Sequence, residues 1–208
     1  MHAKKTGKTK LLAIVLAMVL VFGCAAGGTL AWLKATAGPV TNTFTVGDIN
    51  IDLKEHELQA NGTLGDKEVT ENTNYKMVPG NKLPKDPFVT VEANSEACWL
   101  FIEVTKSTNF DDYMDFDMAD GWTALGGEGN DGVYYRVVDA TTNGAVTFNV
   151  LKGTEGFEDG YVQVRDSVTK DDLADAKDAA PTLSFTAYAV QKDNVANAAE
   201  AWGIAKAA

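Results

Sequence analysis

The sequence has very few of the residues on which most enzymes build a nucleophilic or metal-centred site. It contains two histidines and two cysteines in 208 residues. A zinc protease motif of the H-E-x-x-H type needs two histidines one helical turn apart, and a catalytic triad needs a histidine beside its nucleophile. Only His56 lies beyond the first 31 residues, so neither arrangement can be drawn from the chain. We therefore expect no catalytic residues and no cofactor.

Long apolar runs are also lacking, except at the start of the chain. Leu11 to Phe22 is an apolar run of 12 residues that follows four lysines. A membrane-spanning helix needs roughly 20 apolar residues, whereas the core of a signal peptide needs only about 7–15. The pattern predicts a secretory signal peptide over residues 1–31, which is the chain's only contact with a membrane. A retained N-terminal anchor is the alternative.

Two small-residue motifs compete as the cleavage site. The first motif is residues 29–31, with Thr29 and Ala31 as its small residues, a short distance after the apolar run. Residues 35–37 form the second. The first is at the usual distance, so we predict a mature N-terminus at Trp32. A lipid-modified Cys24 is a further alternative, but a bulky phenylalanine two residues before it fits that motif poorly.

Basic residues are scarce as well. The chain has 18 Lys and Arg against 29 Asp and Glu, a formal net charge of −11, and cleavage after Ala31 would remove four lysines and no acids. A protein this acidic does not attract nucleic acid phosphates. With no anchor-like tail at its C-terminus, we expect it to be released from the cell. Cys98 would be the one remaining thiol, buried in an apolar run, so stability must come from a core rather than a disulfide.

What the chain does have is a series of short runs rich in Val, Ile, Thr and aromatic residues, which strands favour. In "DINIDL", Ile49, Ile51 and Leu53 alternate with polar residues, the period of a strand with one apolar face. The run 98–104 is apolar on both faces and predicts a central strand with its residues 99–101 buried. Further strands are predicted at 88–91, 133–138, 146–151, 160–165 and 182–190.

Turn and helix signals separate these runs. Three prolines in 78–87 predict an irregular crossing, and glycines in 126–132 predict a turn. Short helices are expected over 169–177, where Thr169 can cap the N-terminus, and over 194–202. Together these patterns predict a mainly β fold, a jelly-roll-like antiparallel β-sandwich with one or two short helices.

Two groups of side chains are weak metal candidates. Asp115, Asp117 and Asp120 lie close in sequence and could hold Ca²⁺, although the string departs from an EF-hand loop. His56, between two glutamates, is predicted to lie in a solvated charged loop, with a weak surface metal contact as the alternative.

The stretch "GGTLAWLKATAGPVTNTFTVGDINIDL" (27–53) resembles the start of the TasA/camelysin (CalY) family of secreted proteins from Gram-positive bacteria. The matching residues are Gly28, Thr29, Ala31, Asn42, Thr43, Phe44, Gly47, Ile49, Ile51 and Leu53. Later stretches, "VPG" (78–80), "EACWLFIEV" (96–104) and "LSFTAYAVQ" (183–191), also look like the family's core strands.

The resemblance implies export with the help of a SipW-type signal peptidase and a structural role in extracellular fibres of the biofilm matrix. It implies that copies of the chain, and a minor matrix subunit, are the partners. Each copy would donate an N-terminal strand to the next, with Phe44, Val46, Ile49 and Ile51 as assembly residues. Residues 32–47 would be a spacer and donor strand, ordered only on assembly, and residues 48–208 the sandwich domain. A camelysin-like metalloendopeptidase and a cell-surface adhesion module remain as alternatives.

Overall fold

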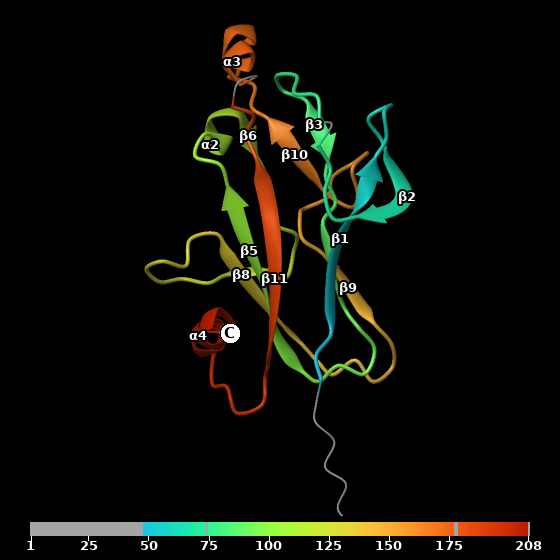
Figure 1. The fold of residues 1–208 in the computed structure, drawn as a ribbon, viewed down its shortest axis with the longest axis vertical. Helices are drawn as coiled ribbons and strands as arrows, with labels where there is room; N and C mark the ends of the chain where they lie inside the picture. Colours follow the sequence, from blue (N-terminus) through green and yellow to red (C-terminus); the bar gives the residue numbers. More distant parts are fainter. Residues whose placement is uncertain (1–47, 74, 177–178, 208) are drawn as a thin grey trace, which may run out of the picture. The chain divides into compact units, whose positions relative to one another are not determined.

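The structure is a computed structural model that describes residues 48–73, 75–176 and 179–207. Its strands and helices are joined by turns and longer loops (Figure 1). The strands are β1 (Ile51–Leu58), β2 (Leu64–Val69), β3 (Lys82–Pro84), β4 (Phe88–Val91), β5 (Cys98–Lys106), β6 (Met114–Asp115), β7 (Thr123–Ala124), β8 (Val133–Val138), β9 (Val146–Asn149), β10 (Tyr161–Val164) and β11 (Leu183–Gln191). The helices are α2 (Phe110–Tyr113), α3 (Lys170–Asp175) and α4 (Ala198–Ala207).

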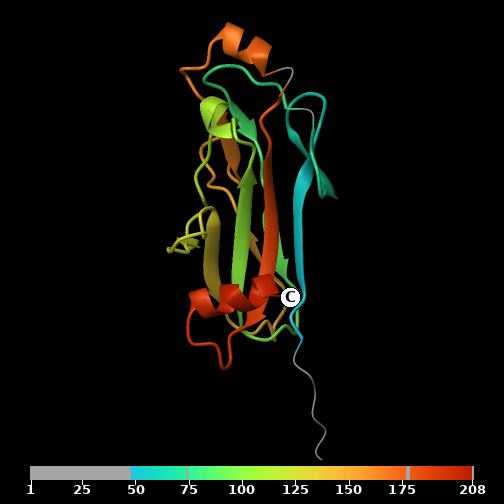
Figure 2. The ribbon, with the colours of Figure 1, turned by 60° about the vertical axis from the view of Figure 1, so that its left-hand side comes forward.

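The strands form antiparallel sheets that pack as a β-sandwich, which confirms the predicted fold class. One sheet has the order β2-β1-β4-β9. A three-stranded sheet has the order β3-β10-β6, and in the chain β3 comes just before β4 and β10 just after β9. The facing sheet has the order β11-β5-β8-β7. Figure 2 shows β1 and β11 running side by side where the two layers meet.

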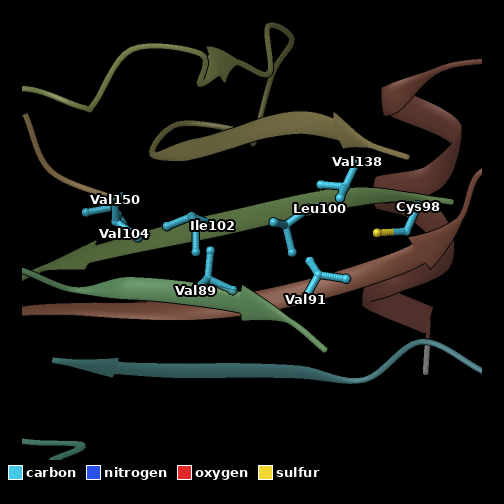
Figure 3. Packing of buried hydrophobic residues seen from close by; sticks show 8 residues of the cluster. All are labelled: Val89, Val91, Cys98, Leu100, Ile102, Val104, Val138 and Val150. Carbon is cyan, nitrogen blue, oxygen red and sulfur yellow. The ribbon is translucent and has the colours of Figure 1, made fainter. Parts of the chain in front are cut away.

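The core between the layers comes from the alternation seen in the sequence. Val89 and Val91 of β4 face Leu100 and Ile102 of β5, and all four side chains are fully buried (Figure 3). Complete burial of a Val, Leu or Ile side chain contributes about 1.5–3 kcal/mol. These residues therefore fix the two sheets against each other.

The outer face of the β11-β5-β8 sheet is covered by α4. Phe101 points to this side and lies 5.3 Å, between ring centroids, from Trp202 of the helix. Leu100 and Phe101 are buried as expected, but Trp99 is only partly buried, so that part of the prediction is wrong. The reason is that the short helix, with Ala198, Ala201 and Trp202 as its buried residues, covers only part of this face.

Both predicted helices are present, although α4 spans 198–207 instead of the predicted 194–202. Local chemistry explains where α3 begins. Thr169 caps α3, its hydroxyl accepting the Asp172 amide while the Asp172 carboxylate accepts the Thr169 amide. This reciprocal capping box satisfies two amides that a helix N-terminus leaves free. A further single helical turn, α2, lies between β5 and β6.

Four strands lie outside the runs that predict strands: β2, β3 and the two-residue β6 and β7. β2 is polar and mostly exposed, and β3 lies inside the proline-rich stretch expected to be irregular. Both are held by pairing with a neighbour, β1 and β10, rather than by burial of their own apolar residues. Alternation of apolar and polar residues marks a strand with one buried face, so it does not reveal a strand that is held mainly by backbone pairing.

Candidate functional site: an open seam between two sheet edges

The sequence-predicted assembly and processing residues fall in two groups. Thr29, Ala31, Trp32, Phe44 and Val46 lie outside the described residues, as does the predicted donor strand. Ile49 and Ile51 are described: both pack against the core between the sheets and both remain partly exposed. Their partial exposure leads to the site, because they stand at one open side of the sandwich.

The first edge of this opening is the N-terminal half of β1. On its inner side, the Asn50 carbonyl accepts the Glu92 amide at 2.8 Å, which continues the β1–β4 ladder. Backbone groups in an antiparallel strand alternate between its two sides, so those of Ile51 and Leu53 point away from β4. Among the described residues, β2 pairs with β1 only from Glu55 onward. The outer edge of Ile51–Lys54 is therefore unpaired in the described part of the chain.

The second edge is β11, which pairs with β5 alone among the described strands. The Thr182 carbonyl accepts the Ser107 amide at 3.0 Å, and the Lys192 amide donates to the Ala97 carbonyl at 2.9 Å. These two bonds place the even-numbered residues of β11 toward β5. The backbone groups of Leu183, Phe185, Ala187 and Ala189 consequently point outward, toward β1.

The same four residues of β11 also direct their side chains inward. They pack against the core cluster, yet all four are partly exposed, as are Ile49, Ile51 and Leu53 of the opposite edge. Apolar side chains that face a core and still reach solvent mark a place where the core lacks its cover. The two unpaired edges, Ile51–Lys54 and Leu183–Ala189, lie close together along part of their length and are open at one end. We call this line between them the β1–β11 seam. An added strand has to part the two edges, because a strand between two others needs about 9–10 Å.

One end of the β1–β11 seam widens into a hollow of about 770 Å³. Its apolar lining comes from several elements: Leu53, Met77, Pro87, Phe110, Met114, Val162, Leu183 and Phe185. Its polar lining includes Tyr75 and the ion pair of Glu55 with Lys85, whose charged atoms lie 2.7 Å apart. The hollow is large enough for an aromatic side chain and part of an extended strand.

The polar groups of the hollow are unusually buried. Glu55 and Lys85 have side-chain exposures of 8% and 11%, so each needs the other to offset the loss of hydration. Tyr75 has a buried hydroxyl with no hydrogen-bond partner among the described residues. Burial, with the charges of Glu55 and Asp86, raises the pKa of Tyr75, which keeps the hydroxyl protonated and available as a donor.

His56 does not lie in a solvated loop, so that prediction is wrong. It occupies the middle of β1, with its Nδ1 2.5 Å from a carboxylate oxygen of Asp86, and the other Asp86 oxygen accepts the His56 amide. The Asp86 side chain is 2% exposed. The sequence could not reveal this contact because the two residues are 30 positions apart and meet only through the β1–β4 pairing.

The three aspartates proposed for Ca²⁺ are not assembled into a site. Asp115 forms an ion pair with Arg165, at 2.5 Å, while Asp117 and Asp120 are exposed. Within the described ranges, no group of three or more His, Cys, Asp or Glu side chains is placed to hold a metal ion.

Cys98 has the environment expected of an inert thiol. It is fully buried, and burial raises its pKa to about 11.

None of the described helices has both the length and the apolar composition of a membrane-spanning segment. Comparisons of the chain with protein-family models, curated proteins and solved structures find no match.

Proposed function

We propose that this chain is a secreted structural protein of the extracellular matrix, which polymerises when residues 40–46 of one copy enter the β1–β11 seam of the next. The observation that carries the proposal is the seam itself, where two unpaired edges and a row of partly exposed core residues face the same opening. A sheet edge with free backbone groups is a template for an added strand. The TasA/camelysin resemblance supports the same role, with a SipW-type signal peptidase and a minor matrix subunit as partners.

The proposed donor segment suits this opening. In "VTNTFTV" (40–46), Val40, Asn42, Phe44 and Val46 share one face, and Phe44 is the largest of them. Ordering the strand costs about 1–2 kcal/mol per residue, and each new backbone hydrogen bond returns only about 0.5–1.5 kcal/mol. Burial of Phe44 adds about 1.5–3 kcal/mol, so this side chain decides whether the strand stays bound. We assign it to the apolar wall around Leu53 and Phe185.

A contact of this kind joins two different surfaces of the same chain. A head-to-tail contact that does not close on itself produces a filament. Because residue 48 begins the described domain directly after the donor segment, each domain that accepts a strand is tied closely to the domain that donates it. The expected product is a fibre of regularly spaced domains.

Two variants test the proposal together. Phe44→Asp should remove the donor, and Ala187→Pro should remove the acceptor, because the Ala187 amide points to the seam and not to β5. Each variant alone should stay monomeric, and an equal mixture should form 1:1 dimers without fibres. Analytical ultracentrifugation and electron microscopy measure both outcomes.

The matched control is Thr186→Pro, which removes an amide that bonds to β5 and should therefore destabilise the fold instead of selectively blocking assembly. Fibres formed by Ala187→Pro alone, or a mixture that stays monomeric while wild-type protein polymerises, would refute strand addition at this seam.

The hollow also supports a second candidate, a ligand-binding module. A volume of about 770 Å³ with a few polar groups lies within the range of small-molecule sites. Such a module would bind its ligand as a monomer, and Phe44→Asp would leave that binding unchanged.

A further inference from the structure

On the opposite side of the sandwich, where β9 faces β7 and β8, side chains bridge the two sheets. The Val150 amide donates to the Pro87 carbonyl at 2.8 Å, so strand alternation directs the backbone groups of Asn149 outward. The Trp122 indole N–H donates to that Asn149 carbonyl at 2.9 Å. Next to it, the Ala119 amide bonds to the Val150 carbonyl and the Lys152 amide to the Asp117 carbonyl, both at 2.9 Å. Residues 117–122 thus lie along the outer edge that follows β9.

A charged side chain fills the space between the two sheets at this side. Arg136 on β8 alternates with Tyr134 and Val138, both of which pack in the core between the sheets, so it points inward with them. Its guanidinium carbon lies 3.8 Å from the ring centroid of Phe148 and 5.2 Å from that of Trp122. The guanidinium is therefore held between two aromatic rings, one from each side of the opening.

The Nε of Arg136 is buried and has no hydrogen-bond partner in the described part of the chain. Burial lowers the pKa of the guanidinium. Gly121 packs directly on it: a Cβ at this glycine would lie 2.9 Å from an Arg136 amino nitrogen, and its φ of +89° is one that glycine favours.

We propose that Trp122 and Arg136 seal this second side, so that each copy of the chain offers one acceptor seam and the assembly cannot branch. An incoming strand would have to displace the indole from the Asn149 carbonyl and strip water from a charge that it cannot pair. Inward-pointing charges protect sheet edges from added strands. At the β1–β11 seam, in contrast, an incoming strand would meet the apolar side chains of Leu183, Phe185, Ala187 and Ala189. The inference rests on the proposed function, since it explains why only one of the two sides of the sandwich takes a strand.

The test counts strands bound per domain. The full mature chain with Phe44→Asp serves as a monomeric acceptor, and a labelled synthetic peptide of residues 38–47 serves as the probe. We expect one peptide per chain, and two after Trp122→Ala and Arg136→Ala are added. Adding Ala187→Pro to that variant should return the count to one. Arg165→Ala, at the chain's other arginine, is the matched control and should leave the count at one.

The outcomes separate the two proposals. No peptide bound to the Phe44→Asp chain refutes the proposed function, whereas two peptides on that chain, or one on the unsealed chain, refute the seal alone. Amide exchange tests the seal without any peptide: Trp122→Ala with Arg136→Ala should speed exchange at Ala119 and Lys152 at least tenfold relative to Arg165→Ala. Unchanged exchange overturns the seal. If the double variant fails to fold, Arg136→Ala alone is measured in the same two ways.

Discussion

At the scale of single residues, the positions that tolerate least change in side-chain volume lie on β4 and β5, in the core between the two sheets. Leu100 is fully buried among valines and isoleucines of both sheets. Interiors are close-packed, so the space left by a deleted side chain refills only in part. The residues at the β1–β11 seam have the same chemistry but remain partly exposed, which separates positions that hold the fold from positions available to a partner.

Leu100→Ala should lower the free energy of unfolding by about 2–5 kcal/mol, because it removes transfer free energy and leaves a cavity. Denaturant unfolding of the mature chain measures the loss. Val137→Ala is the control: Val137 is 41% exposed on the neighbouring strand, and its loss should change stability by less than about 0.5 kcal/mol. Equal effects of the two changes would mean that β5 is not the central strand.

Cys98 should be unreactive in the folded mature chain. With a pKa of about 11, only about one thiol in ten thousand is ionised at pH 7, and the side chain is fully buried. Titration with a chromogenic disulfide reagent should show no reaction within minutes in native buffer, and one thiol per chain in denaturant. Rapid labelling of native protein would place Cys98 at the surface.

His56→Ala should destabilise the fold by about 1–3 kcal/mol, since it removes a partner from the buried Asp86 carboxylate. Thermal or denaturant unfolding measures this cost. Glu57→Ala, at the next residue, breaks only an exposed ion pair with Lys67 and should cost less than about 1 kcal/mol. A neutral effect of His56→Ala would return this histidine to the solvated role that the sequence suggested.

At the scale of elements, α4 is joined to the sheet by a small polar cluster. The Glu103 carboxylate on β5 accepts the Tyr188 hydroxyl of β11 at 2.8 Å and the Lys206 ammonium of α4 at 3.1 Å. Burial opposes ionisation of Glu103, but the hydroxyl and the ammonium together hold its pKa below the usual value. The cluster therefore ties the C-terminal helix to two neighbouring strands.

This cluster predicts a pH dependence with a definite sign. A carboxylate whose pKa is lower in the folded state contributes stability above its unfolded pKa of about 4.3, and loses it as the pH falls through the folded value. Amide exchange in α4 should therefore accelerate below about pH 4 beyond the intrinsic trend. Glu103→Gln should remove this acid-dependent part, and Glu96→Gln, at an exposed glutamate outside α4, should not.

The sequence predicts elements well where one face is buried and poorly where pairing alone holds them. Alternation was sufficient for β1 and a run apolar on both faces for β5, and Thr169 marked the start of α3. The polar β2 and the short β3 were missed because they bury little of their own surface. The β1–β11 seam was not predicted for a different reason. Long-range pairing decides which strands lie at the edge of a sheet, and the sequence does not show it. The apolar residues of β11 were therefore expected to be ordinary core residues.

At the scale of the whole chain, the two sides of the described sandwich differ. One side presents unpaired backbone groups over an apolar opening, and the other is bonded and filled by Trp122 and Arg136. An asymmetry of this kind favours addition of one strand to each domain. It gives a physical basis for the proposed head-to-tail assembly.

The most direct measurement is residue-resolved amide exchange of β11 in the assembled protein and in the Phe44→Asp monomer. The outward amides of Leu183, Phe185, Ala187 and Ala189 should exchange quickly in the monomer and become protected at least a hundredfold in fibres. The amides of Thr186 and Tyr188, which bond to β5, should be protected in both states. Fibres in which the four outward amides exchange as fast as in the monomer would contradict strand addition at the β1–β11 seam.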